Sequence, residues 1–309
     1  MNVRAWAELL RIPGVFTVPG DVLAGAAAGG GRPGRRAAAA VGASVCLYEA
    51  GMVLNDWADR AEDAVERPHR PLPSGRITPG AALGAAVGLT VAGVGLAACA
   101  GRPALTVSGA LAGAVWAYDM GLKHTRAGPA AMAAARGLDL LLGAAATTGR
   151  VRPALFSAAV LAGHTCAVTA VSRQETRGGA PLVPLAGLAV TGAVAGLAGR
   201  GLRGELPAPV RPLAATARTP SPTTARTPSR TAARAAALAT YAVTVGRPLL
   251  HAALNPSPQL TQRAVGAGIR AMVPLQAALS ARAGATGSAV VTAGLAPLAR
   301  RFARRVSIT

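Results

Sequence analysis

Apolar segments of about twenty residues, the length that spans a membrane as a helix, recur along the chain between short polar turns, and they restrict its fold. With 51% apolar and only 14% charged residues, the chain has too little charge for an ordinary soluble domain. Aromatic residues are scarce at 3%, so helices must pack through small and aliphatic side chains, which let membrane helices approach closely. We therefore expect an all-α, polytopic membrane helix bundle.

The pattern predicts about nine transmembrane helices in a single domain over residues 1–309. Residues 203–235 are rich in Pro, Thr, Ala, Ser and Arg, and we expect them to form a disordered low-complexity loop. The last apolar region is either one long span with an amphipathic helix or two spans. The expected spans cover residues 13–30, 37–55, 79–100, 103–121, 129–149, 153–171, 181–200, 235–253 and 263–299.

The formal net charge of +20 does not indicate nucleic-acid binding. The arginines are scattered between apolar segments and form no basic patch interleaved with aromatic residues, so no nucleic-acid partner is expected. The positive charge instead indicates a role in orienting the chain in the membrane, in contacting anionic lipid head groups and in binding an anionic substrate. Glycine patterns of nucleotide-binding loops, zinc-ligand spacings and a serine-hydrolase elbow are not found in the sequence.

Acidic residues are concentrated just after the second apolar segment. Five of the twelve Asp and Glu residues fall within 56–66. On a helix, Asp56, Asp59 and Asp63 share one face, with Asn55 one turn before Asp59. Such hard oxygen ligands suit Mg²⁺, which substrate phosphates usually complete. The alternative is a solvated charged loop between two membrane helices.

Arginines follow the carboxylates and could bind an anion. Arg67, Arg70 and Arg76 are separated by prolines and a glycine, which interrupt the helix. Residues 55–76, the first polar segment, therefore predict a magnesium-diphosphate site.

The pattern N-D-x-x-D-x-x-x-D, followed by R-P-x-R-P-L-P-S-G, resembles the first aspartate-rich motif of the UbiA family of intramembrane prenyltransferases. The resemblance implies a bundle of about nine membrane helices that encloses a prenyl chain. It also implies that Mg²⁺ binds to Asn55, Asp56, Asp59 and Asp63. The residues expected to bind the diphosphate in this motif are Arg60, Arg67 and Arg70.

A second polar segment, residues 118–126, follows two spans later and should lie on the same side of the membrane. UbiA enzymes carry a Tyr and a Lys four residues apart here, with the Lys near the diphosphate. In this chain Tyr118 and Lys123 are five apart, and Asp119 takes the position four residues before Lys123. We assign both Tyr118 and Lys123 to substrate binding; an interfacial Tyr and Lys is the alternative.

The third polar segment, residues 172–177, departs from the family pattern. Where UbiA enzymes have a second motif, D-x-x-x-D, this chain has Ser172 and Thr176. Arg173 and Glu175 are the remaining candidates for substrate binding. This form, with YDMGLKHT, resembles the UbiA-like member (EboC type) of bacterial ebo gene clusters, which is associated with secondary metabolism.

Ionisable residues also occur inside expected spans. An acid within a membrane helix indicates function, and Asp21 should face the bundle interior. Arg136 and Asp139 lie three apart on one helical face and could pair with each other; a structural ion pair and a ligand role are both open.

Together these residues predict a Mg²⁺-dependent prenyltransferase with Asp56, Asp59 and Lys123 as catalytic residues. It would move an isoprenoid from a prenyl diphosphate to a small or lipophilic acceptor within the membrane. The alternative is a non-catalytic binder or carrier of a prenylated or phosphorylated lipid. A secondary transporter is disfavoured because the polar segments lie at span ends rather than at the midplane. We expect a multi-pass protein of the cell membrane with its acidic motifs at the cytoplasmic face.

Overall fold

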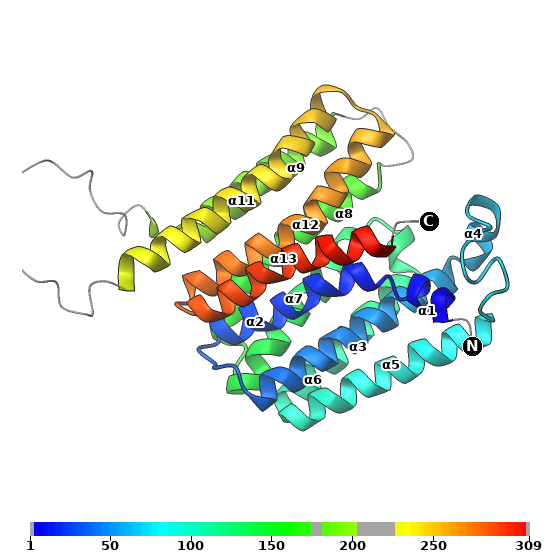
Figure 1. Cartoon of the computed structure of the whole chain (residues 1–309), viewed down its shortest axis with the longest axis horizontal. Coiled ribbons are helices and arrows are strands. Elements are labelled where there is room, and N and C mark those ends of the chain that lie inside the picture. The colour runs from blue at the N-terminus through cyan, green and yellow to red at the C-terminus, as the bar shows by residue number, and fades with distance from the viewer. Residues whose placement is uncertain (1–2, 175–180, 203–225, 307–309) are drawn as a thin grey trace, which may run out of the picture.

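The computed structural model describes residues 3–174, 181–202 and 226–306, and every regular element in these ranges is a helix (Figure 1). The elements are α1 (Val3–Leu9), η1 (Ile12–Thr17), α2 (Val18–Ala28), α3 (Arg35–Ala58), α4 (Arg60–Glu66), α5 (Pro79–Ala100), α6 (Arg102–Met120), η2 (Leu122–His124), α7 (Gly128–Thr148), η3 (Arg152–Ala154), α8 (Leu155–Ser172), α9 (Leu182–Ala198), α11 (Arg226–Leu254), α12 (Pro258–Arg282) and α13 (Thr286–Val306).

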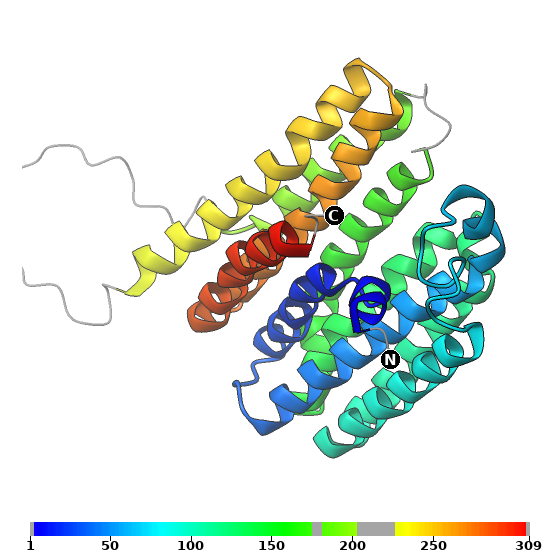
Figure 2. The same cartoon turned by 45° about the vertical axis from the view of Figure 1, so that its right-hand side comes forward.

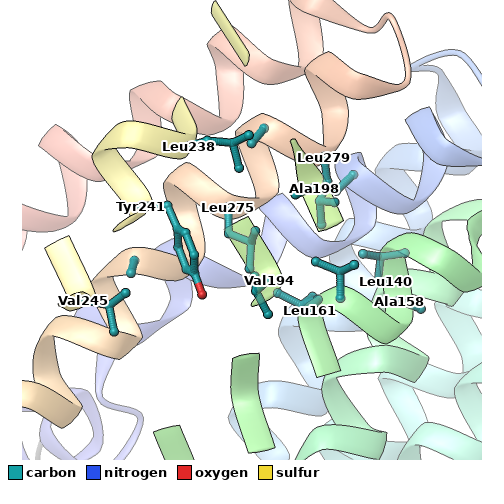
Figure 3. Packing of buried hydrophobic residues seen from close by; sticks show 14 of the residues in the cluster. Leu140, Ala158, Leu161, Val194, Ala198, Leu238, Tyr241, Val245, Leu275 and Leu279 are labelled. Atoms are coloured by element: carbon teal, nitrogen blue, oxygen red, sulfur yellow. The ribbon is translucent and has the colours of Figure 1, made fainter. Parts of the chain in front are cut away.

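The long helices form two packed groups that meet along α2, α7, α8 and α12 (Figure 2). In the first group, α3 packs against α5 and α6 around a core that includes Leu47 and Leu142. In the second group, α11 packs against α9 and α12. Figure 3 shows Leu161, Tyr241 and Leu275 in the core of this group, each from a different helix. Small residues dominate both cores, as close packing of membrane helices requires.

A buried polar contact fixes the second group. His164 on α8 has Nδ1 3.1 Å from the hydroxyl of Tyr241 on α11 and Nε2 3.0 Å from the carbonyl oxygen of Gly268 on α12. Because that carbonyl can only accept, Nε2–H donates to it and Nδ1 accepts from the tyrosine. One neutral imidazole thus satisfies partners on two helices, which limits the cost of burying these polar groups.

Helices α2 and α7 touch through their backbones at two glycines. A Cβ atom added at Gly25 would lie 1.7 Å from the carbonyl oxygen of Leu140, and one added at Gly143 would lie 2.0 Å from that of Val22. Only a residue without a side chain fits at either position, because backbone atoms cannot move aside as a flexible side chain can. The two groups of helices therefore depend on this contact for their close approach.

Replacing either glycine should destabilise the protein. Gly25→Ala and Gly143→Ala introduce a backbone clash and should lower the stability in detergent by roughly 1–3 kcal/mol or more, the usual cost of overpacking. Gly88→Ala on α5 is a matched control, because no atom lies within 4 Å of the added Cβ. Thermal unfolding of the three variants measures this difference; equal melting temperatures for all three would contradict the backbone contact.

Among the described residues, five helices are long and apolar enough to cross a membrane, fewer than the nine that the sequence predicts. Part of the difference lies in shorter apolar helices; the expected first span, for example, is divided between η1 and α2. The five cover Arg35–Ala58, Pro79–Ala100, Gly128–Thr148, Arg152–Ser172 and Pro258–Arg282, and the shorter ones cover Val15–Ala28, Leu182–Ala198 and Thr286–Leu298.

The prediction that residues 203–235 form a disordered loop is wrong for its last ten residues; positions 203–225 lie outside the described residues. Helix α11 begins at Arg226. Arg234 is buried and donates hydrogen bonds to the carbonyls of Ala198 (3.1 Å) and Arg200 (2.6 Å), just beyond α9. A low-complexity sequence becomes helical here because its arginine satisfies carbonyls at a helix end. The region 263–299 forms parts of two helices, α12 and α13; α12 is long and apolar enough to cross a membrane, and α13 contains a shorter apolar stretch, Thr286–Leu298.

Candidate functional site

A cavity of about 420 Å³ lies between α3, α6, α7, α8 and α12. This is within the range of roughly 300–1,000 Å³ typical of small-molecule sites. The end of the cavity near the C-terminus of α3, called the outer end, is polar and is lined by Arg11, Asn55, Tyr118, Asp119 and Ser172. The side walls are mainly apolar, with Leu47, Leu111, Val115, Met132, Val168 and Ile269.

The first polar segment begins on the last turn of α3 and continues into α4. Although α3 ends at Ala58, the helical hydrogen bonds continue: the N–H of Asp59 donates to the carbonyl of Asn55 (3.0 Å) and that of Asp63 to the carbonyl of Asp59 (2.8 Å). Asn55, Asp59 and Asp63 therefore remain one turn apart, as their spacing predicts.

Two of the three aspartates share one arginine. Arg70 Nη1 lies 2.7 Å from Asp63 Oδ2 and 3.5 Å from Asp56 Oδ1. Asp56 Oδ1 also accepts a hydrogen bond of 2.5 Å from Arg11 Nη2. Both carboxylates are buried, and a buried carboxylate requires paired charge. The prolines after Arg67 turn the chain back so that Arg70 reaches the helix that it follows in sequence.

The second polar segment meets the first at the same end of the bundle. Lys123 Nζ, whose side chain is 7% exposed, lies 2.6 Å from Asp59 Oδ1. Asn55 Nδ2 donates a hydrogen bond of 3.1 Å to Asp119 Oδ1. The structure thus brings Lys123 and Tyr118 to the predicted place, and it adds Asp119, which the sequence showed only as a neighbour of these residues.

Arg11 is a site residue that sequence reasoning missed. It is the only described non-glycine residue with a left-handed backbone, at φ 46°, a conformation that costs an L-residue about 1–2 kcal/mol. Its guanidinium reaches Asp56 across the cavity's outer end. In the sequence Arg11 stands before the first apolar segment with no motif around it, so nothing there linked it to Asp56.

None of the four arginines of the first polar segment lines the cavity, and of these four only Arg70 contacts Asp56. Arg60 lies over the Trp57 ring, 4.4 Å from its centroid, and donates to the Trp57 carbonyl. Arg67 is 47% exposed and lies 3.5 Å from Asp63. Arg76 donates to the carboxylate of Glu8 at 2.7 Å, and this hydrogen bond raises the pKa of the Arg76 guanidinium. Arg60 is therefore directed away from the predicted substrate.

The third polar segment contributes one residue to the cavity. Ser172 lines its outer end and donates a hydrogen bond to the carbonyl of Thr169 (2.9 Å), so it brings a hydroxyl where the family pattern has a carboxylate. Arg173 is exposed and donates to the carbonyl of Thr125, which joins the second and third polar segments. Glu175 and Thr176 lie outside the described residues.

Charged residues also occupy the inner end of the cavity. Asp21 is fully buried, as predicted, but Arg136 pairs with Asp21 on α2 instead of with Asp139. Of the two roles that the spacing left open for Arg136, it takes part in a structural ion pair, but with Asp21, because the α2–α7 contact brings the two helices together. Gln276 Nε2 also donates to Asp21 Oδ1 (2.6 Å). Arg136, Asp139 and Ser44 face the cavity.

Comparison with known proteins bears on this arrangement. The sequence model of the UbiA prenyltransferase family matches residues 15–197, more than half of the chain. The protein belongs to the UbiA family. Its apolar helices and its family identify it as an integral membrane protein.

Curated relatives that resemble the chain include digeranylgeranylglyceryl phosphate synthases. That of Methanopyrus kandleri is 35% identical over 128 residues, covering 40% of this chain and 45% of the relative. That of Halobacterium salinarum is 34% identical over 146 residues, covering 46% and 53%. The alignments thus span about half the length of these curated relatives. They name a synthase, and none of them is of the EboC type.

Solved structures of UbiA homologues share the fold. The apo homologue from Aeropyrum pernix superimposes with a TM-score of 0.64 at 17% identity, covering 86% of this chain and 96% of that one. The homologue from Archaeoglobus fulgidus, bound to DMAPP and Mg²⁺, gives a TM-score of 0.54 at 13% identity, covering 86% and 98%. The all-α membrane fold predicted from the sequence is confirmed.

The family implies a Mg²⁺ ion, and the side chains of the first polar segment match the ligands of this ion only in part. Among the residues that the structure describes, no three Asp, Glu, His or Cys side chains converge closely enough to hold a metal ion. The donor set nevertheless suits Mg²⁺, which binds through one or two carboxylates and completes its shell with water and phosphate. Asp56, Asp59 and Asp63 each contact a cationic side chain, so positive charge already occupies the positions that a metal would take.

Removing the shared arginine should reveal this charge balance. Arg70→Ala leaves Asp63 and part of Asp56 uncompensated, and we expect a loss of roughly 2–3 kcal/mol. This is less than the 3–5 kcal/mol typical of fully buried pairs, because the Arg70 side chain is 22% exposed. Mg²⁺ should raise the melting temperature of this variant more than that of the wild type. Arg67→Ala is the matched control and should change stability by less than about 0.5 kcal/mol.

If Mg²⁺ stabilises the wild type, Arg70→Ala and Arg67→Ala equally, the carboxylates do not exchange an arginine for a metal ion, and this interpretation of the site is wrong.

Proposed function

We propose that this chain is a Mg²⁺-dependent prenyltransferase that moves an isoprenoid from a prenyl diphosphate to an acceptor within the membrane. The observation that carries the proposal is that the carboxylates and their cationic partners adjoin the polar end of a mainly apolar cavity, which Arg11 and Asn55 line. A prenyl diphosphate has the matching form: a highly charged head group on a hydrocarbon chain.

The proposed metal ligands are Asn55, Asp56, Asp59 and Asp63, and the bound Mg²⁺ would withdraw charge from the diphosphate. When these oxygens take the metal, Arg11, Arg70 and Lys123 lose their carboxylate partners. Their N–H groups can then donate to diphosphate oxygens, since arginine and lysine bind phosphate well. The protein would thereby exchange internal ion pairs for substrate contacts without leaving a buried charge unpaired.

Catalysis then depends on charge that grows on the leaving group. The allylic C–O bond breaks with both electrons going to the diphosphate oxygen, and the acceptor's nucleophilic atom forms the new bond to carbon and releases a proton. Lys123, whose side chain is 7% exposed, and Arg70 would stabilise the departing oxygens, since preorganised donors act on charge that develops in the transition state. The apolar walls keep water from the allylic cation. Asp56, Asp59 and Lys123 are the proposed catalytic residues.

The other predicted residues have narrower proposed roles. Tyr118 lines the outer end beside the reacting carbon's expected position, and Arg67 can swing from Asp63 to an entering diphosphate. Arg173 and Glu175 are proposed to contact substrate from the third polar segment, whereas the Arg60 contact with Trp57 weakens its case. We also propose a single domain in the cell membrane with the acidic motifs at the cytoplasmic face, and the EboC-type resemblance stays a prediction.

One observation favours a carrier over an enzyme. Ser172 brings a hydroxyl and no charge to the cavity at a position where the family pattern has a carboxylate. A protein with only one acidic motif could bind a prenyl diphosphate and fail to ionise it. Binding and turnover must therefore be measured separately.

The metal ligands can be tested by binding. Asp56→Asn and Asp59→Asn should each reduce Mg²⁺-dependent binding of labelled farnesyl diphosphate at least tenfold, because each removes a charged ligand. Glu62→Gln is the matched control: the residue is exposed and lies in the same segment, and its replacement should leave binding within about twofold. Unchanged affinity in both aspartate variants would remove the basis of the proposal.

Turnover can be tested at the third polar segment. Losing one charge-stabilising group from a preorganised site typically costs roughly 10²–10³ in rate. If the chain is an enzyme weakened by loss of the second motif, Ser172→Asp should raise diphosphate release in the presence of Mg²⁺, while Ser172→Asn should not. A decrease in the Asp variant would show that another group already serves this position.

A further inference from the structure

The cavity has a closed inner end, built from the charged network of Asp21, Arg136 and Asp139 with Ser44 and Gln276. Arg136, Asp139 and Ser44 face the cavity, and Asp21 and Gln276 lie behind them. The buried Oδ1 of Asp139 has no hydrogen-bond partner among the described residues. This end is thus neither apolar nor open.

Two backbone contacts between α2 and α7 lie beyond this network. One turn past Asp21 is Gly25, and one turn past Asp139 is Gly143, the two glycines at which α2 and α7 touch through their backbones. Gln276 also donates to the carbonyl of Thr17 (2.8 Å), which fixes α12 across the same end. A hydrocarbon chain that reaches Asp139 cannot continue, because the next layer is backbone against backbone.

We infer that this closed end limits the prenyl donor to about three isoprenoid units, so that farnesyl diphosphate is the longest donor whose chain fits the cavity. This rests on the proposed function, in which the diphosphate lies at the outer end near Asn55. It names the chain length of the substrate, which the family alone leaves open.

Length supports this limit. Asn55 and Ser44 lie eleven positions apart on α3, which at 1.5 Å per residue gives roughly 16 Å between the two ends of the cavity. An extended peptide spans about 3.3–3.6 Å for three main-chain bonds, so an isoprenoid unit with four such bonds spans roughly 4.5 Å. Three units measure roughly 13–14 Å and fit, whereas four measure about 18 Å and do not.

The volume of about 420 Å³ is large enough for a farnesyl chain, and the limit on a longer chain comes from the length of the cavity.

The test compares binding of geranyl, farnesyl and geranylgeranyl thiolodiphosphates to the full chain in detergent with Mg²⁺. We expect affinity to rise at least tenfold from geranyl to farnesyl, because the third unit is buried, and to fall at least tenfold from farnesyl to geranylgeranyl. If geranylgeranyl binds as tightly as farnesyl, the chain leaves the cavity sideways and the length limit is wrong. If none of the three binds, the proposed function fails instead.

Two variants shorten the cavity from different helices. Ser44→Leu on α3 and Leu111→Phe on α6 each add bulk near the inner end and should weaken farnesyl binding at least tenfold while geranyl binding stays within about twofold. Ala38→Leu, on an exposed position of α3, is the control and should leave the length profile unchanged. Equal loss for both ligands, or no loss, in folded variants would contradict the inference, and the wild-type series decides it if either variant fails to fold.

Discussion

The structure depends on how three buried or half-buried carboxylates are neutralised at one end of a membrane bundle. Asp56, Asp59 and Asp63 come from a single helical stretch, and like charges so close together repel unless cations compensate them. Arg70 and Lys123 provide this compensation, one from the turn after the motif and one from the second polar segment. The protein's own cations thus lie where a metal ion would neutralise these carboxylates. In the proposed function, Mg²⁺ and substrate would exchange with these ion pairs.

The apolar cavity makes this exchange useful. Carboxylates and arginines at a solvated loop would only bind metal weakly, but here they adjoin, through Arg11 and Asn55, the polar end of a mainly apolar cavity between α3, α6, α7, α8 and α12. Electrostatic donors act more strongly in such surroundings. The inner end serves a different purpose from the outer one: the Asp21–Arg136 pair joins α2 to α7 there. One cavity therefore has an exchangeable charged end and a fixed charged end.

The sequence predicted the all-α membrane fold and the place of the metal-binding stretch, because apolar length and the 3,4 spacing of carboxylates are local properties. It also predicted the meeting of Lys123 with the first segment, since both lie at span ends on one side. Arg11, the Asp21–Arg136 pair and the helical start at Arg226 were not foreseen. Each depends on which helices become neighbours: a left-handed turn aims Arg11, and glycine contacts bring α2 to α7. Such contacts join residues far apart in sequence and leave no local pattern.

The most direct measurement is a structure of this protein with Mg²⁺ and farnesyl thiolodiphosphate. The account predicts carboxylate oxygens of Asp56 or Asp59 at about 2.0–2.1 Å from Mg²⁺, the distance this ion requires. It also predicts that Lys123 leaves its present position 2.6 Å from Asp59 and donates to a diphosphate oxygen, with the hydrocarbon chain ending at Ser44. A structure in which the Lys123–Asp59 and Arg70–Asp63 pairs persist while the ligand binds elsewhere would contradict the exchange of ion pairs for metal and substrate.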